Sequence, residues 1–174
     1  MIIIKLYSLE RKENSNLVYV RSQEECSCPY CDGSFKVIGS RKRGLYRLDD
    51  TIDYLIIRRL RCEKCSKISH ELPDIVIPYK RYEADAISEV LDESVEPEDT
   101  CCPAELSTIQ KWKYWVFLLC KVFEAFIRTS TEVKDVRRVV QLPLYPLSRQ
   151  PVGWLKALVR TLVNSGYWGQ TCCA

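Results

Sequence analysis

The sequence predicts an α+β protein, in which an N-terminal β-ribbon held by cysteines precedes an all-helical region with a helix-turn-helix-like pair. Two Cys-x-x-Cys pairs, at residues 28–31 and 62–65, enclose segments rich in β-branched residues. Helical spacing of apolar residues begins only after residue 82. We therefore predict three parts: residues 1–80 as the ribbon domain with N-terminal strands, 81–130 as the helix-turn-helix-like region, and 131–174 as a proline-rich connector with a C-terminal amphipathic helix.

The ribbon half contains four expected strands. Residues 2–7 form the first and residues 16–21 pair with it across a polar turn at 12–15. After the first cysteine pair, residues 35–38 form a strand, 39–44 a basic turn and 51–60 a longer strand. Residues 70–82 contain Pro73 and Pro78, so we predict an extended linker there.

The helical half is less regular. Apolar residues predict a helix at 83–91, followed by an acidic loop at 93–102. A second helix starts near Pro103 or near Ser107 and runs to about residue 128. A short helix at 131–141 and a connector at 142–151 precede an amphipathic helix at 152–164, with Gly166 as its C-cap.

The two cysteine pairs predict one structural zinc ion. The expected ligands are Cys28, Cys31, Cys62 and Cys65, because four thiolates on two tight turns fill a tetrahedral zinc shell and leave no position for a reactive water. A redox Cys-x-x-Cys normally opens a helix, whereas here a turn follows, and a disulfide framework needs an oxidising compartment. His70 and Cys26 are spare candidates for the shell.

Composition favours a globular protein, since the chain is 47% hydrophobic and 28% charged over 174 residues. No apolar run reaches the roughly 18 residues of a membrane span, and residues 1–7 do not resemble a secretion signal. We expect a cytoplasmic protein without a membrane partner.

Charge alternates along the chain. Residues 1–81 carry 16 Lys/Arg against 11 Asp/Glu, residues 82–110 carry nine acids and no Lys/Arg, and residues 111–174 carry ten bases against three acids. Such blocks indicate either partner surfaces or solvated faces.

Two basic segments are candidate contacts to double-stranded DNA. On the ribbon they are Arg41, Lys42, Arg43, Arg47, Arg59 and Arg61. On the second helix they are Ser107, Thr108, Gln110, Lys111 and Lys113, which could read base edges and hold phosphates in a major groove. In this interpretation Trp112 anchors the helix in the core, on the side away from the DNA. The alternatives are a solvated ribbon surface and an ordinary core helix capped by Ser107.

Catalysis is not expected. The chain has one histidine, no P-loop and no Gly-x-Ser-x-Gly, and the acids at 92–99 sit in a single predicted loop.

The segments Cys28-Pro-Tyr-Cys31, Arg58-Arg-Leu-Arg-Cys62-Glu-Lys-Cys65 and His70-Glu-Leu-Pro73 resemble the zinc ribbon that heads many bacterial insertion-sequence transposases. In that family a DNA-binding helix-turn-helix follows the ribbon. The closer resemblance is to short uncharacterised bacterial proteins grouped as a domain of unknown function, which share the ribbon, a segment like residues 72–82 and an ending like residues 153–168.

The resemblance implies a zinc-stabilised DNA-binding accessory of a mobile element, without the transposase catalytic domain. Its expected partners are double-stranded DNA, a separately encoded transposase or recombinase, and a second copy of the chain. The alternative is a zinc-ribbon adaptor that binds another protein and little or no DNA.

Overall fold

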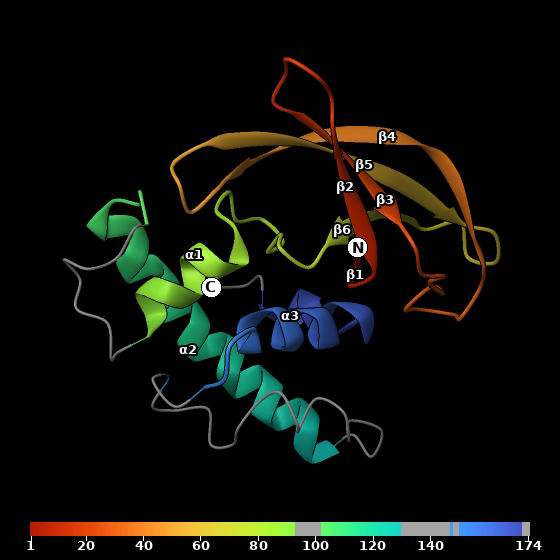
Figure 1. Ribbon diagram of the computed structural model, residues 1–174. Helices are drawn as coiled ribbons and strands as arrows, with labels where there is room; N and C mark the ends of the chain where they lie inside the picture. Colours follow the sequence, from red (N-terminus) through yellow and green to blue (C-terminus); the bar gives the residue numbers. More distant parts are fainter. Residues whose placement is uncertain (93–101, 130–146, 148–149, 172–174) are drawn as a thin grey trace.

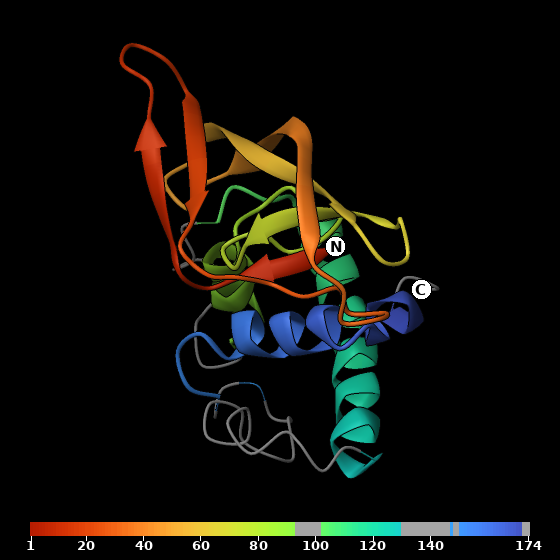
Figure 2. The ribbon, with the colours of Figure 1, turned by 90° about the vertical axis from the view of Figure 1, so that its right-hand side faces the viewer.

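The computed structural model describes residues 1–92, 102–129, 147 and 150–171 of the chain. Within these residues six strands form one strongly curved, nearly closed barrel-like sheet, and the helices gather on one side of it (Figures 1 and 2). The α+β class and the order of strands before helices are confirmed.

The longest pairing is the antiparallel hairpin of β4 (Phe35–Tyr46) and β5 (Ile52–Cys62). The prediction of a turn at residues 39–44 was wrong: these residues lie inside β4, where Arg41 pairs with Ile57. The turn lies at residues 47–51, where the Arg47 amide donates to the Thr51 carbonyl at 2.8 Å. Gly39 instead occupies a β-bulge with φ of +144°, a backbone conformation that favours glycine.

The two edges of β5 differ. β4 covers one edge, whereas the other is shared by β3 (Leu17–Ser22), in parallel, and β6 (Ile68–Pro73), antiparallel. β2 (Tyr7–Arg11) pairs with β3 across the turn predicted at residues 12–15. The prediction of one strand over residues 2–7 was wrong, because the strand is interrupted at residues 5 and 6. The first part, β1 (Ile2–Ile4), pairs in parallel with β6 instead of β3. β1 and β2 follow each other in the chain but lie at the two ends of the strand order β1-β6-β5-β3-β2, so the connection between them nearly closes the sheet.

The described helices are α1 (Ala84–Leu91), α2 (Leu106–Thr129) and α3 (Trp154–Asn164), followed by the 3-10 helix η4 (Tyr167–Thr171). The helices predicted at 83–91 and 152–164 are confirmed within a residue or two. The predicted C-cap is wrong by one residue, because Ser165 caps α3 and Gly166 follows it with φ of +80°. α2 begins between the two predicted starts, and Ser107 is already helical. The predicted short helix at 131–141, and most of the acidic loop and the connector, lie outside the described residues.

One hydrophobic cluster joins the sheet to all three α-helices. The prediction of a linker at residues 70–82 was wrong, because Val76 and Ile77 are completely buried in this cluster. The prolines there shape a buried turn rather than a flexible connection. The predicted division of the chain into three parts, with boundaries after residues 80 and 130, stays a prediction.

α3 also covers the exposed edge of β1. The amide of Ile3 donates to Asn164 Oδ1 at 2.8 Å, and Asn164 Nδ2 donates back to the Ile3 carbonyl at 2.9 Å. One side chain therefore replaces a neighbouring strand and leaves neither backbone group of Ile3 unpaired. No helix among the described residues has the length and apolar content that spanning a bilayer requires.

Candidate metal centre and basic cavity

The two Cys-x-x-Cys segments fold into knuckles with the same hydrogen bonds. In the first, the Asp32 amide donates to the Cys28 carbonyl at 2.9 Å, and in the second the Ser66 amide donates to the Cys62 carbonyl at 3.0 Å. Asp32 and Ser66 each have positive φ, at 55° and 58°. Short polar residues tolerate this left-handed conformation, which turns the chain back sharply after the second cysteine of each pair.

The knuckles bring the four predicted ligands together. All four Sγ atoms lie within 4.8 Å of one another, with 3.7 Å between Cys28 and Cys65 and 3.5 Å between Cys31 and Cys62. Zinc–sulfur bonds of about 2.3 Å in a tetrahedron place sulfurs about 3.8 Å apart, so the cluster fits one ion of this size and preference. Cys28 and Cys62 are buried and the other two are half-buried, as expected of a closed structural site.

Two features prepare this site for a metal. The Cys65 amide donates to the Sγ of Cys62 at 3.4 Å, and this backbone hydrogen bond lowers the pKa of the Cys62 thiol to about 6. Cys62 therefore ionises before Cys31, because, although a backbone hydrogen bond with Gly33 opposes this, burial and hydrogen bonds to the other cysteines raise the pKa of the Cys31 thiol to about 12. Gly33 lies where the knuckles meet: a Cβ there would stand 2.7 Å from Lys64 Cβ and 2.9 Å from Cys62 Sγ.

The spare candidates lie elsewhere. Among the described residues the cluster contains the four cysteines alone, and neither Cys26 nor His70 belongs to it. Cys26 lines a cavity together with the ion pair of Arg58 and Glu71, and burial raises the pKa of its thiol. His70 lines a second cavity, next to the first knuckle.

That second cavity has a volume of about 640 Å³. It lies between β4, β6 and the turn at residues 77–81, with Tyr30 of the first knuckle also in its wall. Its lining contains five cationic residues and the single imidazole of the chain, namely Arg41, Lys42, Arg43, Lys80, Arg81 and His70, and none of the described residues that line it is an acid. Burial, and then the charges of Arg41 and Arg59, lower the pKa of His70, so its imidazole is neutral at neutral pH. We call this space the basic cavity.

Strand register explains which predicted DNA contacts gather here. Arg41 and Arg43 oppose Ile57 and Leu55 across the ladder, so their side chains share a face with the buried residues of β5. Arg59 opposes His70, whereas Arg58 turns to the other face and pairs with Glu71, as the alternation of a strand requires.

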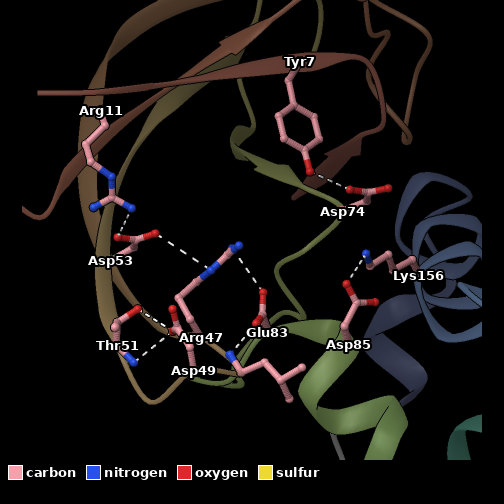
Figure 3. A network of polar contacts seen from close by, with 11 residues as sticks. Tyr7, Arg11, Arg47, Asp49, Thr51, Asp53, Asp74, Glu83, Asp85 and Lys156 are labelled. Atoms are coloured by element: carbon pink, nitrogen blue, oxygen red, sulfur yellow. Dashed lines mark hydrogen bonds and ion pairs between the residues drawn. The ribbon is translucent and has the colours of Figure 1, made fainter.

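Arg47 lies apart from this group. Its guanidinium is 3.1 Å from Glu83 and 3.9 Å from Asp53, and Asp53 also pairs with Arg11 at 2.8 Å (Figure 3). Both carboxylates are largely buried, so Arg47 connects the hairpin turn to the start of α1.

The predicted contacts on α2 lie on its first two turns. Ser107, Gln110, Lys111 and Lys113 are exposed and Thr108 is half-buried. Trp112 is buried and meets Tyr82 edge-on at 5.0 Å, which confirms its expected place in the core.

Sequence reasoning missed three residues of the basic cavity, namely Tyr79, Lys80 and Arg81. They fall in the segment interpreted as a linker, and the available signal was the consecutive run of an aromatic and two cations after Pro78.

Residues 28–112 of the chain match the model of a family described as a domain of unknown function, DUF6431. The match begins at the first zinc-knuckle cysteine and extends into the second turn of α2, so it includes both knuckles, β4–β6 and α1. No curated protein and no solved structure matches the chain.

Proposed function

We propose that this chain is a zinc-stabilised protein that binds double-stranded DNA. It would serve as an accessory of a mobile element, beside a separately encoded transposase or recombinase. The observation that carries the proposal is the basic surface of the β4–β5 hairpin near the cysteine cluster, where the register puts Arg41, Arg59 and Arg61 on one face of the paired strands.

The charge on this surface is not neutralised within the described part of the chain. None of the ion pairs between described residues involves Arg41, Arg59 or Arg61, whereas Arg47 and Arg58 are each held by carboxylates. Unpaired arginines on a rigid ladder release counterions when they meet phosphates, and this release drives non-specific binding to DNA. We therefore leave Arg47 out of the proposed surface.

The first turns of α2 supply the second part of the proposal. Gln110 and Lys113 are exposed while Trp112 anchors the helix in the core, so polar side chains point outward from a fixed support. An amide can read a base edge and a lysine can hold a phosphate.

The alternative function is a protein-binding adaptor, and one observation favours it. Leu106 is 73% exposed and Tyr114 62% exposed, and with Phe117 they follow the spacing of a single helical face on α2. An exposed apolar helix face of this kind fits a groove or helix of a partner protein.

Duplex-DNA binding by the zinc-loaded protein, followed by fluorescence anisotropy over a salt series, tests the proposal. Changing Arg59 and Arg61 together to alanine should weaken binding and reduce the salt slope by about two, since each lost phosphate contact removes about 0.9. Lys12→Ala is the matched control, because Lys12 is an exposed cation at the β2–β3 turn. Tyr114→Ser should leave DNA binding intact under the proposal and should remove partner binding under the alternative.

A further inference from the structure

We propose that the basic cavity binds the terminal phosphomonoester of a nucleic-acid strand, with the end base stacked on a tyrosine at the cavity mouth. This inference rests on the proposed function, and it names the part of the nucleic acid that this cavity takes.

The charge of the cavity is the first argument. Arg41 and Arg43 line the cavity from β4 and Arg81 from the turn after β6, whereas the ammonium of Lys80, another lining residue, lies over the ring of Trp115 at 4.4 Å. With no acid among the described lining residues, these cations repel one another, and burial together with the charge of Arg41 lowers the pKa of Arg43. A cavity walled by one sign of charge concentrates anions of the opposite sign, and a bound phosphate would relieve this repulsion.

The position of Arg43 is the second argument. Its Nη2 donates to the Ile77 carbonyl at 3.0 Å and to the Lys80 carbonyl at 2.8 Å. Its Nε is also buried and has no hydrogen-bond acceptor among the described residues. A buried unpaired donor costs about 1–3 kcal/mol, so the fold keeps a desolvated guanidinium beside the cavity at a measurable cost to stability. Held this way, Arg43 is preorganised for an anion.

The aromatic residues at the mouth favour a nucleotide over a simple anion. Tyr79 is 73% exposed and has φ of +63°, which is strained for a bulky side chain. Such strain costs about 1–3 kcal/mol and is found most often at binding sites. Tyr30, on the first knuckle, is the second exposed aromatic ring in the wall. Stacking a base on such a ring contributes about 1–3 kcal/mol.

The shape of the cavity favours a strand end over the middle of a duplex. Its volume of about 640 Å³ is within the roughly 300–1,000 Å³ typical of small-molecule sites. The buried residues Ile57 and Leu72 form its apolar lining, which suits a ligand that ends inside rather than one that passes through. A phosphate monoester also carries close to two charges at pH 7, whereas each phosphodiester inside a strand carries one.

The test uses the zinc-loaded full chain in buffer without phosphate. Two single-stranded oligonucleotides of one sequence, labelled at the 3′ end, carry either a 5′-phosphate or a 5′-hydroxyl. We expect the phosphorylated strand to bind at least about tenfold more tightly. Arg41→Ala and Tyr79→Leu should remove this preference, whereas Arg21→Ala, an exposed arginine that does not line the cavity, should keep it.

A second readout follows the single histidine of the chain by NMR. Binding of the phosphorylated strand should raise the pKa of His70, because the charge of the phosphate would offset that of the arginines near the imidazole. Equal affinity for the two strands, with no change at His70, would overturn the proposal. Equal affinity for the phosphorylated strand and a free mononucleotide would overturn the strand end as the ligand.

A covalently closed duplex, which has no strand ends, separates this inference from the proposed function. If the closed duplex binds and the 5′-phosphate has no effect, the cavity inference fails and the proposed function stands. If the 5′-phosphate matters and the closed duplex does not bind, the duplex-binding function fails and the cavity remains a strand-end site.

Discussion

The most demanding prediction concerns Gly33, because it tests the contact between the two zinc knuckles. In Gly33→Ala the new methyl group would lie 2.7 Å from Lys64 Cβ and 2.9 Å from Cys62 Sγ. Neither neighbour can move freely, since Lys64 Cβ is fixed by the backbone and Cys62 is a buried ligand. Overpacking of this kind costs about 1–3 kcal/mol. Because the strain exists only when the knuckles close on the metal, we expect zinc affinity to fall about 5- to 150-fold.

Competition with a chromogenic chelator measures this affinity. Gly44→Ala is the matched control, because a Cβ at Gly44 would meet Tyr54 at an ordinary 3.7 Å and its φ is not positive. The control should hold zinc as the unmodified chain does. If Gly33→Ala also held zinc with unchanged affinity, the packing of the two knuckles described above would be wrong.

Three further predictions concern stability, measured by denaturant unfolding. Asn164→Ala should lower the free energy of unfolding by about 1–3 kcal/mol, because it leaves the Ile3 amide unpaired while the Ile3 carbonyl keeps the hydrogen bond from Arg160 Nε at 3.3 Å; an unchanged free energy of unfolding would show that water replaces the side chain. Glu71→Gln should lower the free energy of unfolding by about 2–3 kcal/mol, since Glu71 is 2% exposed and accepts two hydrogen bonds from Arg58. Glu10→Gln, in the exposed ion pair with Arg21, is the control and should lower it by less than about 1 kcal/mol. The lowered pKa of His70 means that the unfolded chain binds its proton more readily, so stability should decrease as pH falls below about 6.5 and His70→Gln should remove this decrease; an unchanged pH profile would contradict the placement of His70 among cations.

The cluster of four cysteines could be predicted from the sequence because its geometry is local. A Cys-x-x-Cys turn places its two sulfurs together whatever surrounds it, and two such turns need only one hairpin to meet. The helix at α1 could be predicted for a similar reason, since Ala86, Ile87, Val90 and Leu91 form one apolar face and all four are buried.

The long hairpin could not be predicted correctly, because local signals conflicted. The basic run at residues 39–44 is polar and contains two glycines, which is typical of a turn. It is instead held in β4 by pairing with β5, because the backbone N–H and C=O groups along this edge of β5 need hydrogen-bond partners. The turn signal was the pair Asp49 and Asp50, with Asp50 at φ of 60°.

The closure of the sheet and the basic cavity depend on contacts between distant residues. β1 pairs with β6 across more than 60 residues, and no pattern within either strand specifies that partner. Once β6 is placed, the turn at residues 77–81 returns beside β4 and brings Lys80 and Arg81 to Arg41 and Arg43. The sequence contained these cations, but only the topology places them in one cavity.

The most direct test of the central claim is to measure duplex-DNA binding by one preparation of the protein before and after zinc removal, across a salt series. The account predicts binding that weakens steeply with salt when zinc is present, because the arginines of the hairpin contact phosphates. It also predicts that removing the metal abolishes this binding, since the knuckles position the strands that carry those arginines. No binding at low salt by the zinc-loaded protein, or equal binding after zinc removal, would contradict it.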